Sequence, residues 1–155
     1  MNTEKGHCIY GKYSVCKSPE GITTLGLGSC VGICIRDPVA KVGGLAHAML
    51  PDSRQIENNS NRAKFADTGI EDLVQKILAI GGRKARLEAK LAGGAQMFAF
   101  QNKSDMVRVG ERNVEASKKK LRELGIRLNY GRTIVFYPET GELIIRSAGK
   151  PEKKI

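Results

Sequence analysis

The sequence predicts a mixed α/β fold built as one domain over residues 1–155. Short segments with alternating apolar residues occur in both halves of the chain, which is typical of strands. Two segments with apolar residues at helical spacing lie between them. No repeat or linker interrupts this order, and 155 residues can bury a substantial core without disulfides or metals. The tail from about 149 to 155 is expected to fray.

Four of the predicted strands lie in the first third of the chain. Residues 6–17 alternate loosely, and residues 22–27 form a second short strand. Residues 31–36 alternate more strictly, and residues 42–50 are a further apolar run. Asp37-Pro38 between these two runs is a turn signal, so they are predicted to form an antiparallel hairpin.

The first predicted helix begins at a cap on Asp67 or Thr68 and runs to about Ile80, where Gly81-Gly82 end it. Its apolar stripe consists of Ile70, Leu73, Val74, Ile77 and Leu78. A polar segment, 52–61, precedes it and is predicted to be a flexible loop near the rim of the site.

The second half of the chain supplies the remaining elements. Residues 87–91 alternate as a strand before Gly93-Gly94, and Met97, Phe98 and Phe100 follow. A second helix is predicted over 110–124, with Val114, Ser117, Leu121 and Leu124 facing inward. A hairpin of 133–137 with 142–146 ends the fold.

Composition narrows the class of protein. Apolar residues make up 41% and charged residues 27%, which is ordinary for a globular domain. No apolar run approaches the length of a membrane span, and the N-terminus lacks the apolar region of a signal peptide, so we expect a cytoplasmic protein that is not membrane-inserted. The net charge of +10 favours anionic partners, but no motif for specific nucleic-acid binding is present.

Cofactors and metals are not expected. The four cysteines have no C-x-x-C spacing or four-ligand zinc pattern, and a reducing cytoplasm disfavours disulfides. Gly93-Gly94 starts neither a dinucleotide-binding nor a P-loop motif, which leaves a tight turn or close packing as its predicted use.

The segment around Cys30 and His47 carries the clearest chemical possibility. If Arg36 pairs with Lys41 around the hairpin loop, Cys30 lies directly opposite His47, within reach of a thiol–imidazole contact. A glycine-rich approach ends in Gly28-Ser29, so backbone N–H groups of Gly28, Ser29 and Cys30 can hold an oxyanion. The hydroxyl of Thr24 can point at the imidazole.

Structural interpretations compete with this site. A lone cysteine is most often a small buried hydrophobe, and a lone histidine in an apolar run is usually a hydrogen-bonded core residue. Threonine is a good strand former without any catalytic role. From spacing alone, these interpretations outweigh a catalytic pair.

The sequence nevertheless resembles the CheD family of chemoreceptor glutamine deamidases over nearly its whole length. The residues that carry the resemblance are Thr24-Leu25-Gly26-Leu27-Gly28-Ser29-Cys30, Asp37-Pro38, Gly43-Gly44, His47, Leu50-Pro51, Lys64-Phe65-Ala66-Asp67, Gly93-Gly94-Ala95 and Gly131-Arg132.

The resemblance implies an enzyme that hydrolyses the side-chain amide of receptor glutamines. It assigns Cys30 as nucleophile, His47 as base and Thr24 as the third member of the triad. It implies layered sheets with helices outside, similar to the catalytic domain of cytotoxic necrotizing factor toxins. The implied partners are the cytoplasmic helices of methyl-accepting chemotaxis proteins and a CheC-type phosphatase of phosphorylated CheY.

Three alternatives remain open at this point. The chain can act mainly as a non-catalytic activator of a CheC-type phosphatase. The same thiolate can hydrolyse a glutamate methyl ester. Nucleic-acid binding rests only on the positive charge, which gives non-specific and salt-sensitive affinity.

Overall fold

The computed structural model describes residues 3–9, 11–24, 26–94, 109–130, 135–137, 142–145 and 153–154. Several predicted features lie outside these residues: Met97, Phe98 and Phe100, the Gly131-Arg132 pair, the turn over 138–141, and most of the tail.

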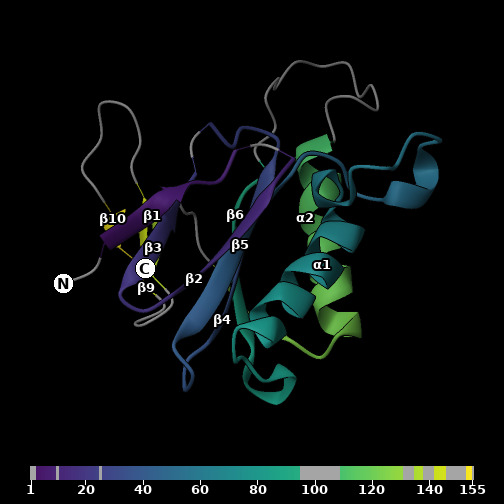
Figure 1. Cartoon of the computed structure of the whole chain (residues 1–155). Coiled ribbons are helices and arrows are strands. Elements are labelled where there is room, and N and C mark those ends of the chain that lie inside the picture. Colours follow the sequence, from purple (N-terminus) through teal and green to yellow (C-terminus); the bar gives the residue numbers. More distant parts are fainter. Residues whose placement is uncertain are drawn as a thin grey trace.

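Two five-stranded sheets form two layers of the fold (Figure 1). The first has the order β1-β3-β8-β9-β10, with bounds Thr3–His7, Glu20–Thr23, Val135–Tyr137, Glu142–Ile145 and Lys153–Lys154. The second has the order β2-β5-β4-β6-β7, with bounds Tyr13–Lys17, Val42–Ala48, Val31–Asp37, Glu88–Gly93 and Arg127–Tyr130. Among the described strands, each sheet contains one parallel pair, β1 with β3 and β6 with β7, and its other pairs are antiparallel. The predicted mixed α/β class is therefore confirmed.

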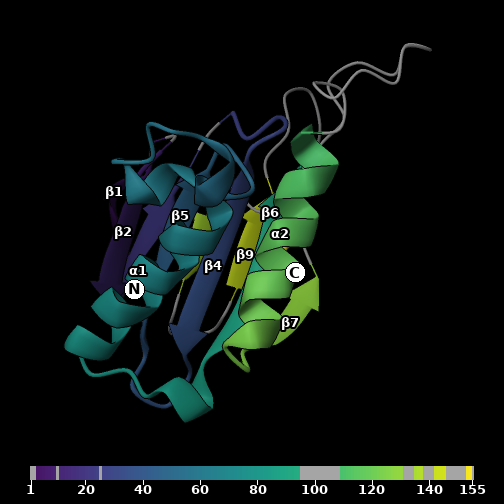
Figure 2. The ribbon, with the colours of Figure 1, turned by 90° about the vertical axis from the view of Figure 1, so that its right-hand side faces the viewer.

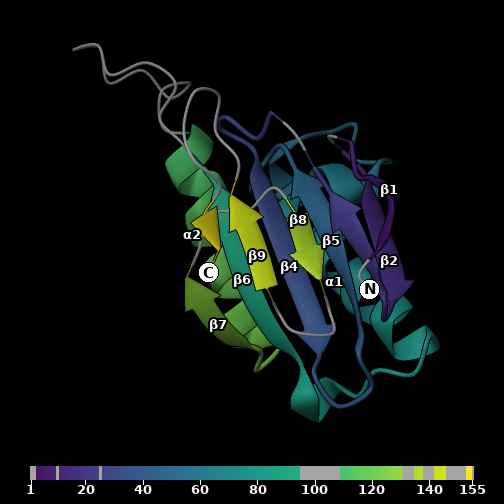
Figure 3. The ribbon, with the colours of Figure 1, turned by 90° about the vertical axis from the view of Figure 1, so that its left-hand side faces the viewer.

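Both helices cover the face of the second sheet that points away from the first (Figure 2). They are α1 (Ala66–Ala79) and α2 (Val109–Glu123); short 3₁₀ turns η1 (Ser53–Gln55) and η2 (Arg62–Lys64) precede α1, and η3 (Lys84–Arg86) follows it. Figure 3, from the opposite side, shows β8 and β9 in front of the central strands of the second sheet. Within the described part of the chain, no helix is long and apolar enough to cross a bilayer.

The predicted caps of the first helix are wrong, although its apolar stripe and its glycine end are confirmed. α1 begins after Phe65, whose side chain makes no capping hydrogen bond. The candidate caps bind elsewhere, because the Asp67 carboxylate accepts from Ser53 and the Thr68 hydroxyl donates to the Arg62 carbonyl. Gly81 ends the helix at a φ of 110°.

The predicted strand over 6–17 is two strands rather than one. β1 and β2 lie in different sheets, and the chain between them turns at Gly11, which has a φ of 69°. Cys8, directly after β1, donates its N–H to the carbonyl of Thr23 at 2.7 Å. The strand predicted over 22–27 is shifted as well, since β3 ends at Thr23.

Two apolar clusters separate the three layers. The larger one lies between the second sheet and the helices, where Ile33, Ile35, Ile70 and Leu73 are fully buried. The smaller cluster belongs to the other face of the second sheet and consists of Cys8, Cys16, Ile22, Cys34 and Leu45. Each large apolar side chain buried in this way contributes about 1.5–3 kcal/mol.

The β4–β5 hairpin closes one residue further along the chain than predicted, at Asp37 and Val42 instead of Arg36 and Lys41. Asp37 pairs with Val42, so His47 lies opposite Gly32 and not opposite Cys30. The difference arises in the loop, where Lys41 has a φ of 55° that no strand residue can adopt. A two-residue shift preserves the face of every side chain on the paired strands, so His47 stays on the face of Gly32 and Cys34, and Cys30 lies directly before β4.

The Asp37 carboxylate is fully buried and binds the backbone at the end of this hairpin. It accepts hydrogen bonds from the backbone N–H groups of Val39 and Ala40 in the loop, and from the N–H of Arg83 and the guanidinium of Arg86 after α1. Burial by itself raises the pKa of Asp37, but the hydrogen bonds from Arg86, Ala40, Arg83 and Val39 outweigh it and hold the pKa at about 2.

We expect Asp37→Asn to lower the free energy of unfolding at pH 7 by about 2 kcal/mol. Because the folded-state pKa is depressed, this stabilisation is present above the ordinary carboxyl pKa and is lost as the pH falls from about 4 to about 2. Urea unfolding at pH 7 and at pH 3 measures the effect, and the difference between wild type and variant should shrink at the lower pH.

Asp52→Asn is the matched control. The Asp52 carboxylate also has a pKa of about 2 through its partner Arg54, but that guanidinium is 76% exposed, so the pair contributes little. Equal losses in the two variants, or no loss in Asp37→Asn, would contradict the role given to the buried carboxylate.

Candidate active site

Cys30 lies in a tight approach to β4, with the backbone held on both sides. Its N–H donates to the carbonyl of Leu27 at 2.7 Å, which closes a turn in which Gly28 has a φ of 50°. Its carbonyl accepts from the N–H of Gly94 at 2.8 Å. Cys30 is partly exposed, whereas Cys8, Cys16 and Cys34 are buried. Among the four thiols it is therefore the one that a substrate can reach.

His47 lies on β5, on the face that looks toward the first sheet, and is 1% exposed. Its backbone is held by Gly11 and Lys12, because its N–H donates to the carbonyl of Lys12 at 2.9 Å and its carbonyl accepts from Gly11 at 2.8 Å. Gly32, opposite, supplies no side chain; a Cβ there would lie 3.8 Å from the Thr24 methyl carbon and 3.4 Å from Leu27. Thr24, Leu27 and His47 therefore all lie near Gly32, at the start of β4.

The hydroxyl of Thr24 joins His47 to the backbone of Cys8. Thr24 Oγ1 lies 2.6 Å from the carbonyl oxygen of Cys8 and 2.8 Å from His47 Nδ1. A carbonyl only accepts, so the single hydroxyl proton is donated to Cys8, and Thr24 accepts from an N–H at Nδ1. The neutral imidazole therefore carries its proton on Nδ1, which leaves the lone pair on Nε2.

Burial favours the neutral form of both groups. Desolvation raises the pKa of the Cys30 thiol above its ordinary value, with a smaller opposing effect from a backbone hydrogen bond. Desolvation likewise lowers the pKa of His47, partly offset by the Cys8 backbone. Burial therefore favours a neutral thiol and a neutral imidazole in the resting protein.

Two contributors to this geometry escape sequence-based reasoning. The carbonyl of Cys8 is a backbone group and carries no side-chain signal. Asn113, on the inward face of α2, is fully buried and donates from Nδ2 to the carbonyls of Ser29 and Met49. Of the predicted inward residues, Ser117 and Leu121 are buried, whereas Val114 and Leu124 are partly buried against the larger core.

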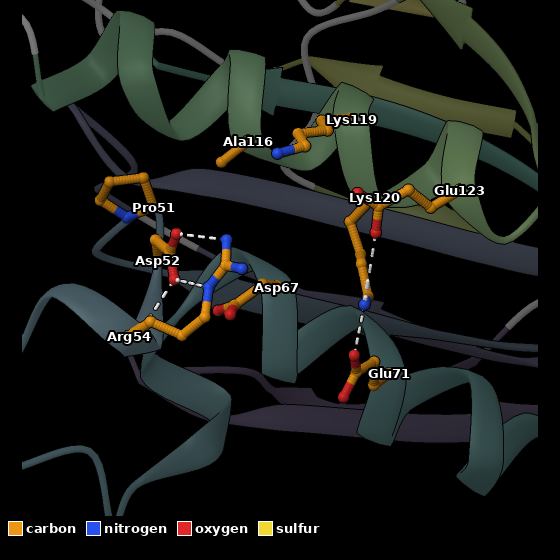
Figure 4. Close-up of a pocket in the computed structure, with 9 residues that line it drawn as sticks. All are labelled: Pro51, Asp52, Arg54, Asp67, Glu71, Ala116, Lys119, Lys120 and Glu123. Carbon is orange, nitrogen blue, oxygen red and sulfur yellow. Dashed lines mark hydrogen bonds and ion pairs between the residues drawn. The ribbon is translucent and has the colours of Figure 1, made fainter.

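A charged pocket lies between η1, α1 and α2 (Figure 4). Its lining contains neither Cys30 nor His47 and consists of Pro51, Asp52, Arg54, Asp67, Glu71, Ala116, Lys119, Lys120 and Glu123. Figure 4 shows Lys120 of α2 between the carboxylates of Glu71 and Glu123. The pair with Glu71 ties the two helices together. The described residues contain no group of three or more metal-ligating side chains.

Comparison with known proteins points to one family. The model of the family described as CheD chemotactic sensory transduction matches residues 49–147. A protein of Lachnoclostridium phytofermentans named probable chemoreceptor glutamine deamidase CheD is 61% identical over 149 residues, covering 92% of each chain. The chemoreceptor glutamine deamidases CheD of Halalkalibacterium halodurans and Thermotoga maritima are 51% and 47% identical; each alignment covers 92% of this chain, and 93% and 92% of the relatives.

The rate of Cys30 alkylation by iodoacetamide should rise with pH through and beyond the ordinary thiol range, because burial raises the pKa of this thiol. Mass spectrometry of native protein quenched at intervals measures the rate at each pH. Cys30→Ala should take up no label while folded, since the other cysteines are buried. A rate that is already constant by neutral pH would instead indicate a thiolate–imidazolium pair.

Gly93→Ala should displace Cys30. Gly93 has a φ of 86°, and a Cβ on it would lie 2.3 Å from the carbonyl oxygen of Cys30. We expect the free energy of unfolding to fall by about 1–2 kcal/mol because of the backbone conformation, and to fall further because of this contact. Thermal unfolding measures the loss of stability, and the alkylation rate of Cys30 measures its displacement.

Gly125→Ala is the control for backbone strain, because Gly125 has a φ of 71° and open space around it. It should lower stability without changing the alkylation of Cys30. An unchanged alkylation rate in Gly93→Ala would show that Gly93 does not control the position of Cys30.

Proposed function

This chain belongs to the CheD family, and we propose that it hydrolyses the side-chain amide of chemoreceptor glutamines to glutamate and ammonia, with Cys30 as nucleophile. The observation that carries the proposal is the hydrogen-bonded series from the Cys8 carbonyl through Thr24 to His47. His47 lies on β5, which pairs with β4, and β4 begins directly after Cys30. This arrangement occurs in a chain 61% identical to a probable chemoreceptor glutamine deamidase. A buried imidazole with a defined tautomer beside a reachable thiol is suited to acyl transfer.

In the proposed acylation, His47 Nε2 takes the proton of the Cys30 thiol as the sulfur attacks the side-chain carbonyl carbon. The C–S bond forms while the carbonyl π electrons move to oxygen. The imidazolium then returns the proton to the departing nitrogen, ammonia leaves, and a thioester remains. Water, deprotonated by His47, hydrolyses the thioester to glutamate and restores the thiol.

The oxyanion is assigned to the backbone before β4. The N–H of Cys30 already donates to Leu27, so it can serve an oxyanion only by leaving that turn. We therefore assign the N–H groups of Gly28 and Ser29 as the donors, with Cys30 contributing if the turn opens. Thr24 acts as a positioning residue, because it accepts from Nδ1 and keeps the lone pair on Nε2.

The proposed partners follow from the family. The substrate would be the helices of receptor cytoplasmic domains, so the protein would act in the cytoplasm. These helices are rich in Glu and Gln, and a net charge of +10 favours their approach. A CheC-type phosphatase is proposed as a second partner. The layered arrangement of two sheets and outer helices also agrees with the predicted relation to cytotoxic necrotizing factor catalytic domains.

Incubation of the protein with a receptor cytoplasmic fragment tests the activity, with mass spectrometry to detect conversion of Gln to Glu. We expect conversion by wild type and none by Cys30→Ala, while His47→Ala should lower the rate by about 10²–10⁴-fold. Thr24→Val should lower it less, by about tenfold to a hundredfold, since it removes orientation only.

Thr23→Val is the matched control for Thr24→Val. Thr23 is the adjacent residue and is 3% exposed, and its hydroxyl has no hydrogen-bond partner among the described residues. The Thr23→Val variant should convert glutamine at the wild-type rate. If wild type leaves glutamine unchanged but hydrolyses a glutamate methyl ester on the same fragment, the site is an esterase; if it does neither and binds a CheC-type protein, the regulatory alternative holds.

A further inference from the structure

We propose that Asn113 of α2 is a positioning residue for the reaction, which ties the backbone beside the nucleophile to the backbone beside the base. The inference rests on the proposed function for the meaning of Cys30 and His47. Its geometry stands independently, in two hydrogen bonds from one buried carboxamide to the segments just before β4 and just after β5.

The carboxamide of Asn113 uses both of its N–H donors. Nδ2 lies 2.9 Å from the carbonyl oxygen of Ser29 and 2.9 Å from that of Met49. Both acceptors are backbone carbonyls, so the opposite orientation of the amide would place Oδ1 against two acceptors. The direction of the side chain is therefore defined by its partners.

The two carbonyls lie at the ends of the strands that carry the proposed chemistry. The Ser29 carbonyl belongs to the peptide group that supplies the N–H of Cys30, directly before β4. Met49 directly follows β5, two residues after His47, and its N–H is held by the carbonyl of Lys64. Asn113 thus completes the fixation of Cys30, because Gly94 holds the peptide group on the other side of this residue.

Packing alone does not account for an asparagine at this position. Asn113 is fully buried, and its Oδ1 has no hydrogen-bond partner within the described part of the structure. Burying an acceptor without a donor is unfavourable, and an apolar side chain of similar size would avoid this. What an apolar residue cannot do is bind both carbonyls.

The helix that carries Asn113 is itself anchored. Leu121 and Ser117 are buried on the same face, and Lys120 forms an ion pair with Glu71 of α1 (Figure 4). α1 in turn packs on the second sheet through Ile70 and Leu73. Asn113 therefore reaches the site from a fixed support rather than from a loop.

Asn113→Leu keeps the buried volume and removes both donors. We expect kcat for glutamine conversion to fall by about tenfold to a hundredfold, with KM within about twofold, because the reacting groups lose alignment while the substrate surface is intact. Cys30 alkylation should slow at neutral pH, where it depends on His47. It should approach the wild-type rate at a pH above the thiol pKa, where thiolate forms without a base.

Ser117→Ala is the matched control, since Ser117 is buried one turn further along α2 and donates to the backbone carbonyl of Asn113. It should keep the wild-type kcat and alkylation profile even if the melting temperature falls. Asn113→Asp provides a second test in a side chain of equal size. Its protonated carboxyl group can donate to one carbonyl and its carboxylate to neither, so kcat should fall as this buried group ionises.

A folded Asn113→Leu variant with wild-type kcat and alkylation would overturn the proposal. If that variant does not fold, Asn113→Asp decides, and a kcat profile parallel to that of wild type at every pH overturns it equally. If wild type itself converts no receptor glutamine, the proposed function fails, whereas the alkylation comparison still shows whether Asn113 aligns Cys30 with His47.

Discussion

The hydrogen bond from the Thr24 hydroxyl to the Cys8 carbonyl is the interaction on which the site depends. It consumes the only proton of Thr24, and this obliges His47 to donate from Nδ1. Cys8 follows β1, Thr24 follows β3 and His47 lies on β5, so one buried hydroxyl connects residues from both sheets. In a buried setting these bonds are costly to break, and the imidazole is oriented before any substrate arrives.

The two faces of β4 have different surroundings: one packs in the core and the other faces the candidate site. Its odd-numbered residues, Val31, Ile33 and Ile35, are fully buried against the helices and form part of the larger core. Its even-numbered face begins at Gly32, where the missing side chain leaves space for the residues that surround His47. Because alternation assigns each face of a strand separately, the core can be packed tightly without filling the site.

The sequence predicts faces better than it predicts pairing. The alternation of β4 correctly separated Ile33 and Ile35, which lie in the larger core, from Cys34, which lies in the smaller one. The predicted register of β4 with β5 was wrong by two positions, because Lys41 adopts a left-handed conformation in the loop. The predicted caps of α1 were also wrong. The side chains of Asp67 and Thr68 form hydrogen bonds with Ser53 and Arg62 instead of capping the helix. The contributions of the Cys8 carbonyl and Asn113 depend on contacts between distant segments, which no local pattern encodes.

Burial explains why positioning carries so much of the proposed chemistry. Desolvation raises the pKa of Cys30 and lowers that of His47, so the site holds no preformed thiolate to compensate for poor alignment. Proton transfer from sulfur to Nε2 must then accompany attack, which requires both groups within hydrogen-bonding reach and at a fixed angle. Backbone carbonyls supply that constraint: Cys8 orients the base through Thr24, and Ser29 and Met49 connect both strands to α2. A side chain that binds two such carbonyls, as Asn113 does, influences reactivity without touching the substrate.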